Sequence, residues 1–476
     1  MRLLALVVAA LAAGPVLAQL GPLTPPAGPI SDTVPDLSQI AQQVSGAAQT
    51  RTIVNNVSTP GDASNKFIIS QPGSYVLADD IVFGGADAGK NGVLIQADDV
   101  TLDLNGYTIR GNGFALAGVI GDNAAPVRSV VRNGNITDTG EWAVLLFGDD
   151  CRAERLTVVN TGGGFAAIQV GTQGQVDRCI VRDAAGDGIA VGIHGTVRAS
   201  TITGATSDGI TTSANALVID SNVAQVDGVG ITVSNDALVE RCTIRQTGST
   251  GLSMLQGSVA RSVRVRFAGQ HGATTTGYNK LIDCSFINLT GNGVNLGAYS
   301  VVDRCTFQLC SQLAVVPGVS SIIQNSIAEN CTSAFVASIN TTVRGCTIEK
   351  MSVLGIEGLP QSVIENNTIR DADFSGISAA GGCLVRGNNI SQCGDGVRVA
   401  GAGNSIDSNN LFNNNIGIRV VVPGSMANRI TRNSLLAASR PTTTFPPPAT
   451  TSRSAATRPP RDRSTTSSSR AFGPRA

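Results

Sequence analysis

A Gly-apolar pair returns at a nearly constant interval along most of this chain. Gly-Ile stands at 188–189, 209–210 and 230–231, which are steps of 21 residues. The series continues to 417–418, with Ala replacing Gly in some copies, and reaches back to 92–93 with longer steps, giving sixteen copies. A repeat this short is one coil of a solenoid, because a single repeat cannot bury its apolar face without neighbours.

A second pattern lies between successive pairs: apolar, two polar residues, one small polar residue, any residue, apolar. Examples are VDRCIV at 176–181, VERCTI at 239–244 and VRGNNI at 385–390. Each copy therefore predicts two or three strands of three to five residues, joined by turns. The repeats have no helical period, which argues against a leucine-rich repeat fold, because that fold has a helix in each repeat. Sixteen parallel coils spaced by about 4.8 Å would extend for about 75 Å.

Alternation along the strands predicts which side chains enter the core. Ile189 and Val191 should point inward, together with their equivalents in the other copies. The residues between them should point outward, and they are small: Ala190, Thr211, Thr232, Ser253 and Thr274. We therefore expect one outer face of the solenoid to be low and smooth.

The two ends differ from the repeats. Residues 1–18 have the charged start, apolar run and small-residue cleavage site of a secretory signal, so the protein is expected to be secreted or periplasmic. Residues 19–51 form a linker with one expected helix at 36–48, and 52–436 hold the coils. Residues 437–476 are rich in Thr, Pro and Arg and are expected to be disordered. A frameshift that replaced the last coil would also explain this tail.

Charge and hydropathy exclude some partners. Between Gln19 and Ser439 there are 26 basic and 33 acidic residues, without the clustered basic face that nucleic acids require. No segment after the signal is apolar enough to predict a transmembrane helix. The oligomeric state is left open.

Two opening segments resemble a known superfamily. ISQPGSYVLADDI at 69–81 and NGVLIQADDVTLDLNGYTIRGNG at 91–113 resemble the first coils of right-handed parallel β-helix proteins, the pectate-lyase-like superfamily. The resemblance covers 52–436 and implies an all-β fold of right-handed coils with an internal asparagine ladder. That superfamily holds lyases, hydrolases, epimerases and non-catalytic surface proteins, so its fold does not give the activity.

The expected ladder is a column of small polar residues at one offset in the coils. In an Asn ladder each amide bonds to the coils above and below. The column was read as Cys179, Ser200, Ser221, Cys242, Ser262, Cys284, Cys305, Asn325, Cys346, Asn367, Asn388, Asn409 and Asn433.

Ten cysteines in an exported chain suggest disulfides, but the column spacing favours buried thiols. Cys179 and Cys242 would be about 14 Å apart, and in-register Cβ atoms of Cys284 and Cys305 would be about 4.8 Å apart, which is wide for a bridge. Both states remain open. The sequence contains no CxxC pair, which would have indicated a metal site.

The polar column directly before the Gly is the first candidate for chemistry. Asp187 and Asp208 are expected on adjacent coils about 5 Å apart. Carboxylates this close can act as acid and base or bind Ca²⁺, and His194 follows the same strand as Asp187. The alternative is that Asp-Gly is turn chemistry, because Asp tolerates tight bends.

Further candidates are weaker in pattern. Trp142 lies near the acidic cluster Asp138, Asp149 and Asp150, and it is either a sugar-stacking platform or a core or cap aromatic. The column of Asp187 and Asp208 also contains His271, Asn292 and Asp395. NITD, GDD and GIHG are faintly similar to motifs of the polygalacturonase branch but lack its Asn-Thr-Asp order and its Arg-x-Lys, so no roles are transferred. A lyase would need a Ca²⁺ cluster and a basic residue, and the residues do not single out which arginine would serve.

Two functions follow. The chain is either a non-catalytic surface or envelope protein that contacts extracellular or cell-wall polysaccharide, or a polysaccharide lyase, hydrolase or epimerase acting on an acidic glycan. The first is favoured, because no complete catalytic signature is present. No metal ligand or cofactor is assigned, and Ca²⁺ would enter only with the second function.

Overall fold

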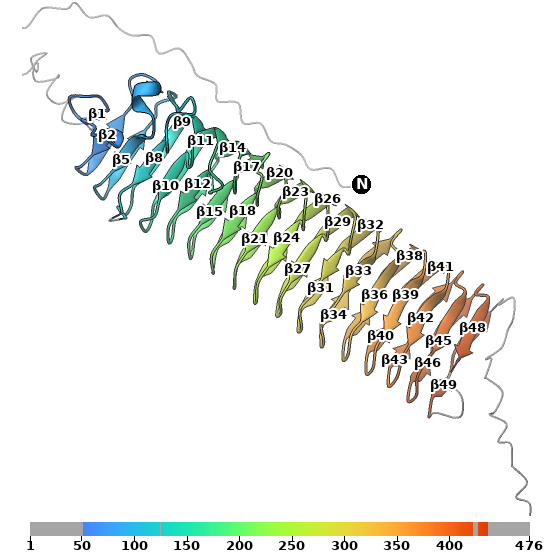
Figure 1. The fold of residues 1–476 in the computed structure, drawn as a ribbon. Helices are drawn as coiled ribbons and strands as arrows, with labels where there is room; N and C mark the ends of the chain where they lie inside the picture. Colours follow the sequence, from blue (N-terminus) through green and yellow to red (C-terminus); the bar gives the residue numbers. More distant parts are fainter. Residues whose placement is uncertain (1–50, 124, 422–426, 437–476) are drawn as a thin grey trace, which may run out of the picture. The chain divides into compact units, whose positions relative to one another are not determined.

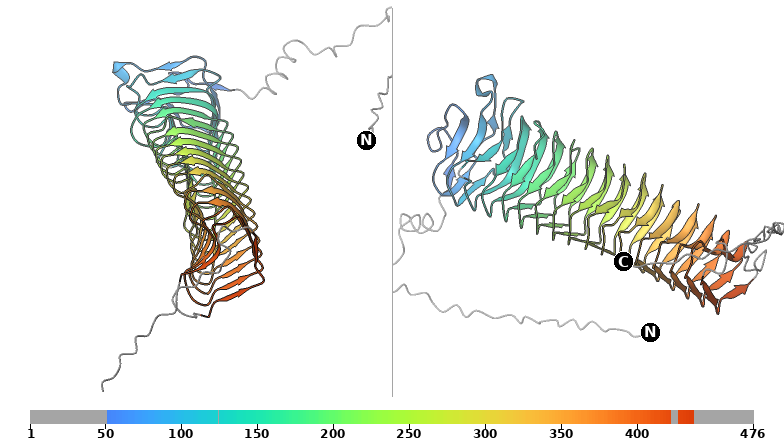
Figure 2. Two further views of the ribbon diagram at one scale, coloured as in Figure 1. Left: turned by 90° about the vertical axis from the view of Figure 1, so that its right-hand side faces the viewer. Right: turned by 60° about the horizontal axis from the view of Figure 1, so that its bottom comes forward.

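The computed structural model describes residues 51–123, 125–421 and 427–436, and these residues form a stack of right-handed β coils (Figure 1). Further views show the same strand positions repeating from coil to coil (Figure 2). The predicted all-β solenoid is confirmed. The predicted signal segment at 1–18, the expected helix at 36–48 and the tail at 437–476 lie outside the described residues.

The first sheet contains seventeen parallel strands, each paired with its equivalent in the next coil. This is one more than the sixteen Gly-apolar copies, because Lys66-Phe67 occupies the pair's position in β2. The strands are β2 (Asn65–Ile69), β5 (Asn91–Ile95), β8 (Val119–Gly121), β10 (Val144–Leu146), β12 (Ile168–Val170), β15 (Ile189–Val191), β18 (Ile210–Thr212), β21 (Ile231–Val233), β24 (Leu252–Met254), β27 (Ala273–Thr275), β30 (Val294–Asn295), β33 (Leu313–Val316), β36 (Ser333–Ala337), β39 (Leu354–Gly358), β42 (Ser375–Ala379), β45 (Asp395–Val399) and β48 (Ile416–Val420).

The second sheet contains 33 strands in two columns, so most coils have three strands. The ten-residue strands β9 (Val130–Thr139) and β11 (Arg152–Thr161) run through both columns and join them. One column holds β1 (Thr52–Ile53), β3 (Gly73–Val76), β6 (Val100–Asp103), β13 (Gln175–Asp177), β16 (Thr196–Arg198), β19 (Leu217–Ile219), β22 (Leu238–Glu240), β25 (Val259–Arg261), β28 (Lys280–Ile282), β31 (Val301–Asp303), β34 (Ile322–Gln324), β37 (Thr342–Arg344), β40 (Val363–Glu365), β43 (Leu384–Arg386), β46 (Ser405–Asp407) and β49 (Arg429–Thr431).

The other column of the second sheet closes each coil. It holds β4 (Ile81–Val82), β7 (Thr108–Arg110), β14 (Ile180–Ala184), β17 (Thr201–Thr203), β20 (Asn222–Val226), β23 (Thr243–Thr247), β26 (Arg264–Ala268), β29 (Ser285–Leu289), β32 (Thr306–Cys310), β35 (Ile327–Glu329), β38 (Thr347–Met351), β41 (Thr368–Ala372), β44 (Asn389–Ser391), β47 (Asn410–Phe412) and β50 (Ser434–Leu436). A single 3₁₀ turn, Gly85–Asp87, is the one helical element among the described residues, where no helix is long and apolar enough to cross a membrane.

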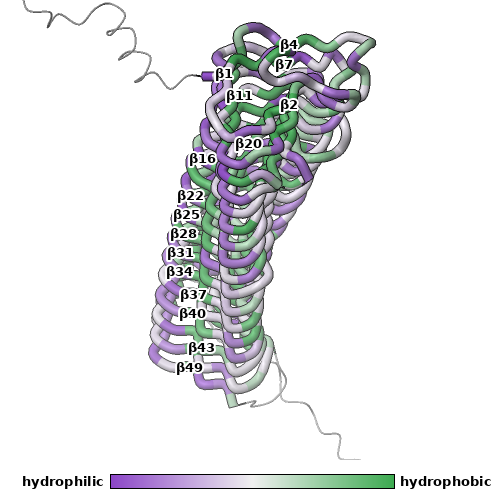
Figure 3. Tube along the Cα trace, turned by 90° about the vertical axis from the view of Figure 1, so that its left-hand side faces the viewer, coloured by the Kyte–Doolittle hydropathy of each residue, from purple (hydrophilic) through white to green (hydrophobic). Residues whose placement is uncertain are grey.

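Close packing explains why Gly recurs before each first-sheet strand. A Cβ added to Gly188 would overlap the Ile202 side chain and would lie 2.6 Å from the carbonyl oxygen of Gly209. The space is already filled by the third strand of the same coil and by the backbone of the next. Ile189 and Val191 point into the core as expected, and hydrophobic positions repeat in register down the stack (Figure 3).

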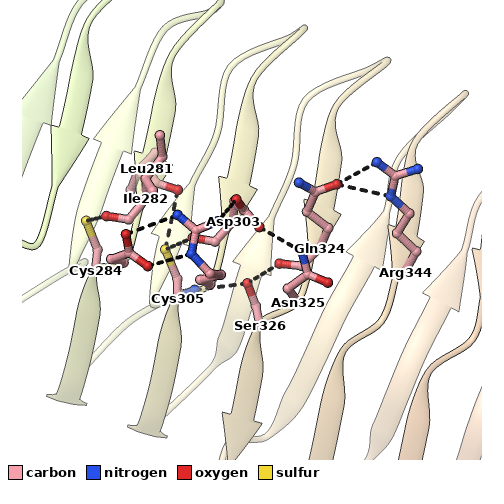
Figure 4. Close-up of polar contacts among 11 residues, drawn as sticks. Leu281, Ile282, Cys284, Asp303, Cys305, Gln324, Asn325, Ser326 and Arg344 are labelled. Atoms are coloured by element: carbon pink, nitrogen blue, oxygen red, sulfur yellow. Dashed lines mark hydrogen bonds and ion pairs between the residues drawn. The ribbon is translucent and has the colours of Figure 1, made fainter.

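The expected ladder is present, with two corrections. Asn388 accepts the backbone N–H and the side-chain N–H of Asn367, both at 3.0 Å, and donates to Asn409 at 2.9 Å. The predicted members Ser262 and Asn325 are wrong by one position, because the repeat places Val263 and Ser326 in the buried column. Figure 4 shows Ser326 at the backbone of Cys305, while Asn325 turns outward.

A second internal ladder, which sequence analysis missed, follows the first-sheet strands. Asn279 accepts the backbone N–H of Ser258 at 2.8 Å, and Ser300 accepts that of Asn279 at 3.1 Å. The same arrangement returns where Asn404 accepts the N–H of Cys383 at 2.9 Å. Both ladders give buried turn backbone its hydrogen bonds, which a solenoid interior would otherwise leave unpaired.

All ten cysteines are buried and unpaired in the structure, which agrees with the interpretation as packing thiols. Burial raises the pKa of Cys179 and of Cys346 to about 12. These thiols therefore behave as small apolar side chains.

The charged turns between the second and third strands form an exposed ridge. Arg241 contacts Glu240 of its own coil at 2.7 Å and Asp220 of the preceding coil at 2.7 Å. Arg304 repeats this with Asp303 and Asp283. Such exposed pairs contribute little each to stability.

Candidate functional site on the outer face of the first sheet

The outward side chains of the first sheet form one continuous row, because the strands are in register. Gln169, Ala190, Thr211, Thr232, Ser253, Thr274 and Asn295 follow one another on adjacent coils. Each is small or carries a hydroxyl or amide. The expected low, smooth face is therefore present from β12 to β30, and we call it the polar row.

A groove of about 400 Å³ lies over the first part of the polar row. Gln169, Ala190 and Thr211 form its floor. Phe147 and Ile193, which are 51% and 46% exposed, stand on its rim in the turns after β10 and β15. Its lining contains no Asp, Glu, His, Lys or Arg.

Asp187 and Asp208 lie on adjacent coils, but their carboxylates are occupied. Oδ1 of Asp208 accepts the backbone N–H of Val229 at 2.7 Å, and Oδ2 accepts the hydroxyl of Thr232 at 2.7 Å. Asp187 does the same for the backbone of Asp208 and the hydroxyl of Thr211. The carboxylates thus accept hydrogen bonds from the turn and the strand of the next coil. The hydroxyls of Thr211 and Thr232 use their hydrogens in these bonds, so they can only accept hydrogen bonds from a ligand.

His271 takes the same capping position three coils further along. Its Nδ1 accepts the backbone N–H of Asn292 at 3.1 Å, which places the ring proton on Nε2. Burial lowers the pKa of His271, so the neutral ring is favoured. The next residue of the column, Asn292, in turn accepts the backbone N–H of Leu313 at 3.0 Å.

His194 does not join Asp187. It lies in the exposed turn after β15, with φ at 58°, whereas Asp187 precedes that strand. Asp138 and the pair Asp149 and Asp150 are similarly divided, because they lie on either side of β10. No triad of acid, base and histidine is therefore assembled from these predicted residues.

Trp142 stands before Ala143, in the position that Asp187 takes before Gly188. Its ring stacks on that of Phe165 with centroids 4.5 Å apart and planes 24° apart. Phe165 is 48% exposed and comes from the adjacent coil. Sequence analysis missed Phe165, although its spacing from Trp142 is close to one repeat.

Metal-binding groups do not gather on this face. Within 51–123, 125–421 and 427–436 no three Asp, Glu, His or Cys side chains form an arrangement that could hold a metal ion. Each of the four carboxylate oxygens of Asp187 and Asp208 accepts a hydrogen bond from the next coil, and no third Asp, Glu, His or Cys among the described residues joins the pair in a group that could hold Ca²⁺.

One family model agrees with the fold, and it matches two overlapping parts of the chain. The family model "Right handed beta helix region" matches residues 209–383 and 332–442. No curated protein matches the chain. Among solved structures, the mannuronan C-5 epimerase A-module of Azotobacter vinelandii is 15% identical, covering 57% of this chain and 87% of that one, with a TM-score of 0.39.

Two further structures are similarly distant. The catalytic unit of an α-1,3-glucanase from Streptomyces thermodiastaticus is 12% identical over 65% of this chain and 64% of that one, with a TM-score of 0.36. A periplasmic alginate epimerase is 10% identical over 73% of this chain and 77% of that one, with a TM-score of 0.31.

Proposed function

Because this chain is a right-handed β-helix protein, we propose that it binds an extracellular polysaccharide along the outer face of its first sheet, without cleaving it. The observation that carries the proposal is the polar row beside the apolar rim of Phe147 and Ile193. A sugar ring has apolar faces and a circumference of hydroxyl groups, and such amphipathic ligands suit apolar surfaces with a few fixed polar groups.

The threonine hydroxyls give the row a defined polarity. Thr211 and Thr232 donate to Asp187 and Asp208, and so present acceptor oxygens at the surface. An extended glycan lying along the stack would offer hydroxyl protons to these acceptors in successive coils. The regular spacing of the coils favours a polymer over a compact ligand.

The groove favours binding over hydrolysis. Glycoside hydrolysis uses two carboxyl groups on opposite sides of the scissile bond, about 5 to 9.5 Å apart. No carboxylate lines the groove, and those of Asp187 and Asp208 are held by backbone and threonine groups of the next coil. Product release from any glycan would support the alternative, a lyase, hydrolase or epimerase.

A glycan panel tests the proposal. Binding of the purified protein to neutral and uronate polysaccharides would be measured by affinity electrophoresis, and product release would be assayed with and without Ca²⁺. Phe147→Ala should weaken binding about tenfold by removing the rim, whereas Phe267→Ala, which removes an equally exposed ring from β26 of the second sheet, should leave it unchanged. Absence of binding by the folded protein would overturn the proposal.

The proposal includes export through the leader at residues 1–18. N-terminal sequencing of the protein recovered from the periplasm or the medium should begin at Gln19. Recovery of full-length protein from the cytoplasm alone would contradict it.

A further inference from the structure

Two arginines lie side by side on the face of the first sheet, beyond the polar row. Arg398 of β45 and Arg419 of β48 are register partners on adjacent coils. Their side chains are 29% and 40% exposed. Like charges that face each other across paired strands destabilise a sheet unless a counter-charge compensates them.

The compensation inside the protein is incomplete. Asp395 is 4% exposed and accepts Nε of Arg419 at 2.9 Å, while Arg398 approaches the same carboxylate at 3.8 Å. The buried carboxylate thus supplies one negative charge for two guanidinium groups. Glu357, on the same face, is separated from Arg398 by the coil of Ser378, and no ion pair in the described part of the chain joins it to either arginine.

The guanidinium of Arg398 is held in place, but its N–H groups donate no hydrogen bond to any described residue. It lies over the ring of Phe374 at 5.0 Å, and that ring is 49% exposed. Its distance of 3.8 Å from Asp395 is too long for a hydrogen bond. Arg419 uses only Nε, so its terminal N–H groups carry no hydrogen bond among the described residues.

The charged ridge provides the contrast within the same chain. There, Arg304 has one carboxylate from its own coil and a second from the preceding coil, with contacts of 2.6 and 2.7 Å. Arg304 thus has two carboxylates to itself, whereas Arg398 and Arg419 share one. The face that carries this pair is also the face that carries the polar row.

We propose that Arg398 and Arg419 form a subsite for an anionic substituent, the carboxylate of a uronate or the sulfate of a sulfated sugar, on the glycan that binds the polar row. Planar guanidinium groups bind such anions through paired N–H bonds. Asp395 is the positioning residue that orients Arg419, and the ring of Phe374 orients Arg398. The inference rests on the proposed function and specifies its ligand as an acidic glycan.

The test compares three oligosaccharide series, neutral, uronate and sulfated, by isothermal titration at two salt concentrations. Arg398→Gln should weaken binding of one acidic series about tenfold and reduce its salt dependence, with binding of the neutral series unchanged. The bond between Arg419 and Asp395 persists in this variant, so it should fold. Arg304→Gln, on the ridge, is the matched control. It should change neither the binding of the acidic series nor its salt dependence.

The outcomes separate the two proposals. Uronate and sulfated series that respond differently to Arg398→Gln identify the substituent. If the wild-type protein binds glycans with no preference for acidic ones, the anionic subsite is wrong and the proposed function stands. If no glycan binds, the proposed function fails. Equal weakening of acidic binding by Arg304→Gln would show general charge attraction and would overturn the subsite.

Discussion

The Oδ1 atom of Asp187 accepts the backbone N–H of Asp208 at 3.0 Å, so the carboxylate of one coil supports the turn of the next. The two residues were predicted to be neighbours, and they are. Their chemistry differs from that of an acid pair, because each carboxylate is directed along the stack to a backbone N–H and a threonine hydroxyl.

Asp208→Ala should destabilise the protein by about 1 kcal/mol, because it removes the carboxylate that accepts the half-buried N–H of Val229 and the hydroxyl of Thr232. Asp208→Asn keeps an acceptor oxygen and should cost less. Urea unfolding measures both, with Asp227→Ala at an exposed turn as the control. If Asp208→Asn left stability unchanged and abolished product release from a glycan, the carboxylate would be catalytic.

The asparagine ladder should be more sensitive than any surface amide. Asn388→Ala removes bonds to Asn367, Asn409 and the carbonyl of Ile364 in a buried column, and should cost about 1–3 kcal/mol or more. Asn410→Ala is the matched control, since its side-chain bond to Asn389 is exposed and its loss should change the urea midpoint little. Equal effects of the two substitutions would contradict the ladder's structural role.

Acid should loosen the ridge at its C-terminal end. The hydrogen bond from Arg432, with a second from Thr431, lowers the pKa of Asp407 to about 2 from its usual 3.8. Because the folded-state pKa is depressed, the stabilising contribution is complete above about pH 4 and is lost as the pH falls toward 2. In urea titrations the difference between wild type and Asp407→Asn should therefore shrink over that range. A difference that stays constant down to pH 2 would contradict this assignment.

The fold could be predicted because its contacts are periodic. Once Gly188 and Gly209 are aligned, every residue has its neighbours at about one repeat before and after, and alternation gives the inward positions. The prediction of the polar column is wrong at Ser262 and Asn325, because these residues were chosen for their type although they lie one position off the repeat. Val263 and Ser326 keep the period, because burial is set by position in the coil.

The candidate site could be predicted only in part. Residue type does not show whether a carboxylate is free or already bonded, so Asp187 and Asp395 were equivalent in the sequence. The pairing of Arg398 with Arg419 follows from the register, but its significance depends on the single buried carboxylate beside them. Phe147 and Ile193 gave no sequence signal, since isolated exposed apolar residues are common.

Thiol labelling tests the state of the cysteines. Burial raises the pKa of Cys242 to about 11 and that of Cys179 to about 12, and the thiolate is the reactive form. The native protein should therefore react slowly with a disulfide reagent at pH 8, and all ten thiols should react in denaturant without prior reduction. A lower count in denaturant, restored by a reductant, would show that disulfides form.

The recurring glycine should be the most demanding position of the repeat. A Cβ at Gly209 would overlap the Val223 side chain of the third strand and approach the carbonyl of Gly230, so Gly209→Ala should destabilise by about 1–3 kcal/mol through overpacking. Gly84→Ala is the control, because no atom lies within 4 Å of an added Cβ there and the backbone is extended. Ala143 and Ala167 occupy this place in two earlier coils, where they are fully buried. If thermal unfolding showed Gly209→Ala to be as stable as Gly84→Ala, the 21-residue recurrence of Gly would need another cause than close packing between the first and third strands.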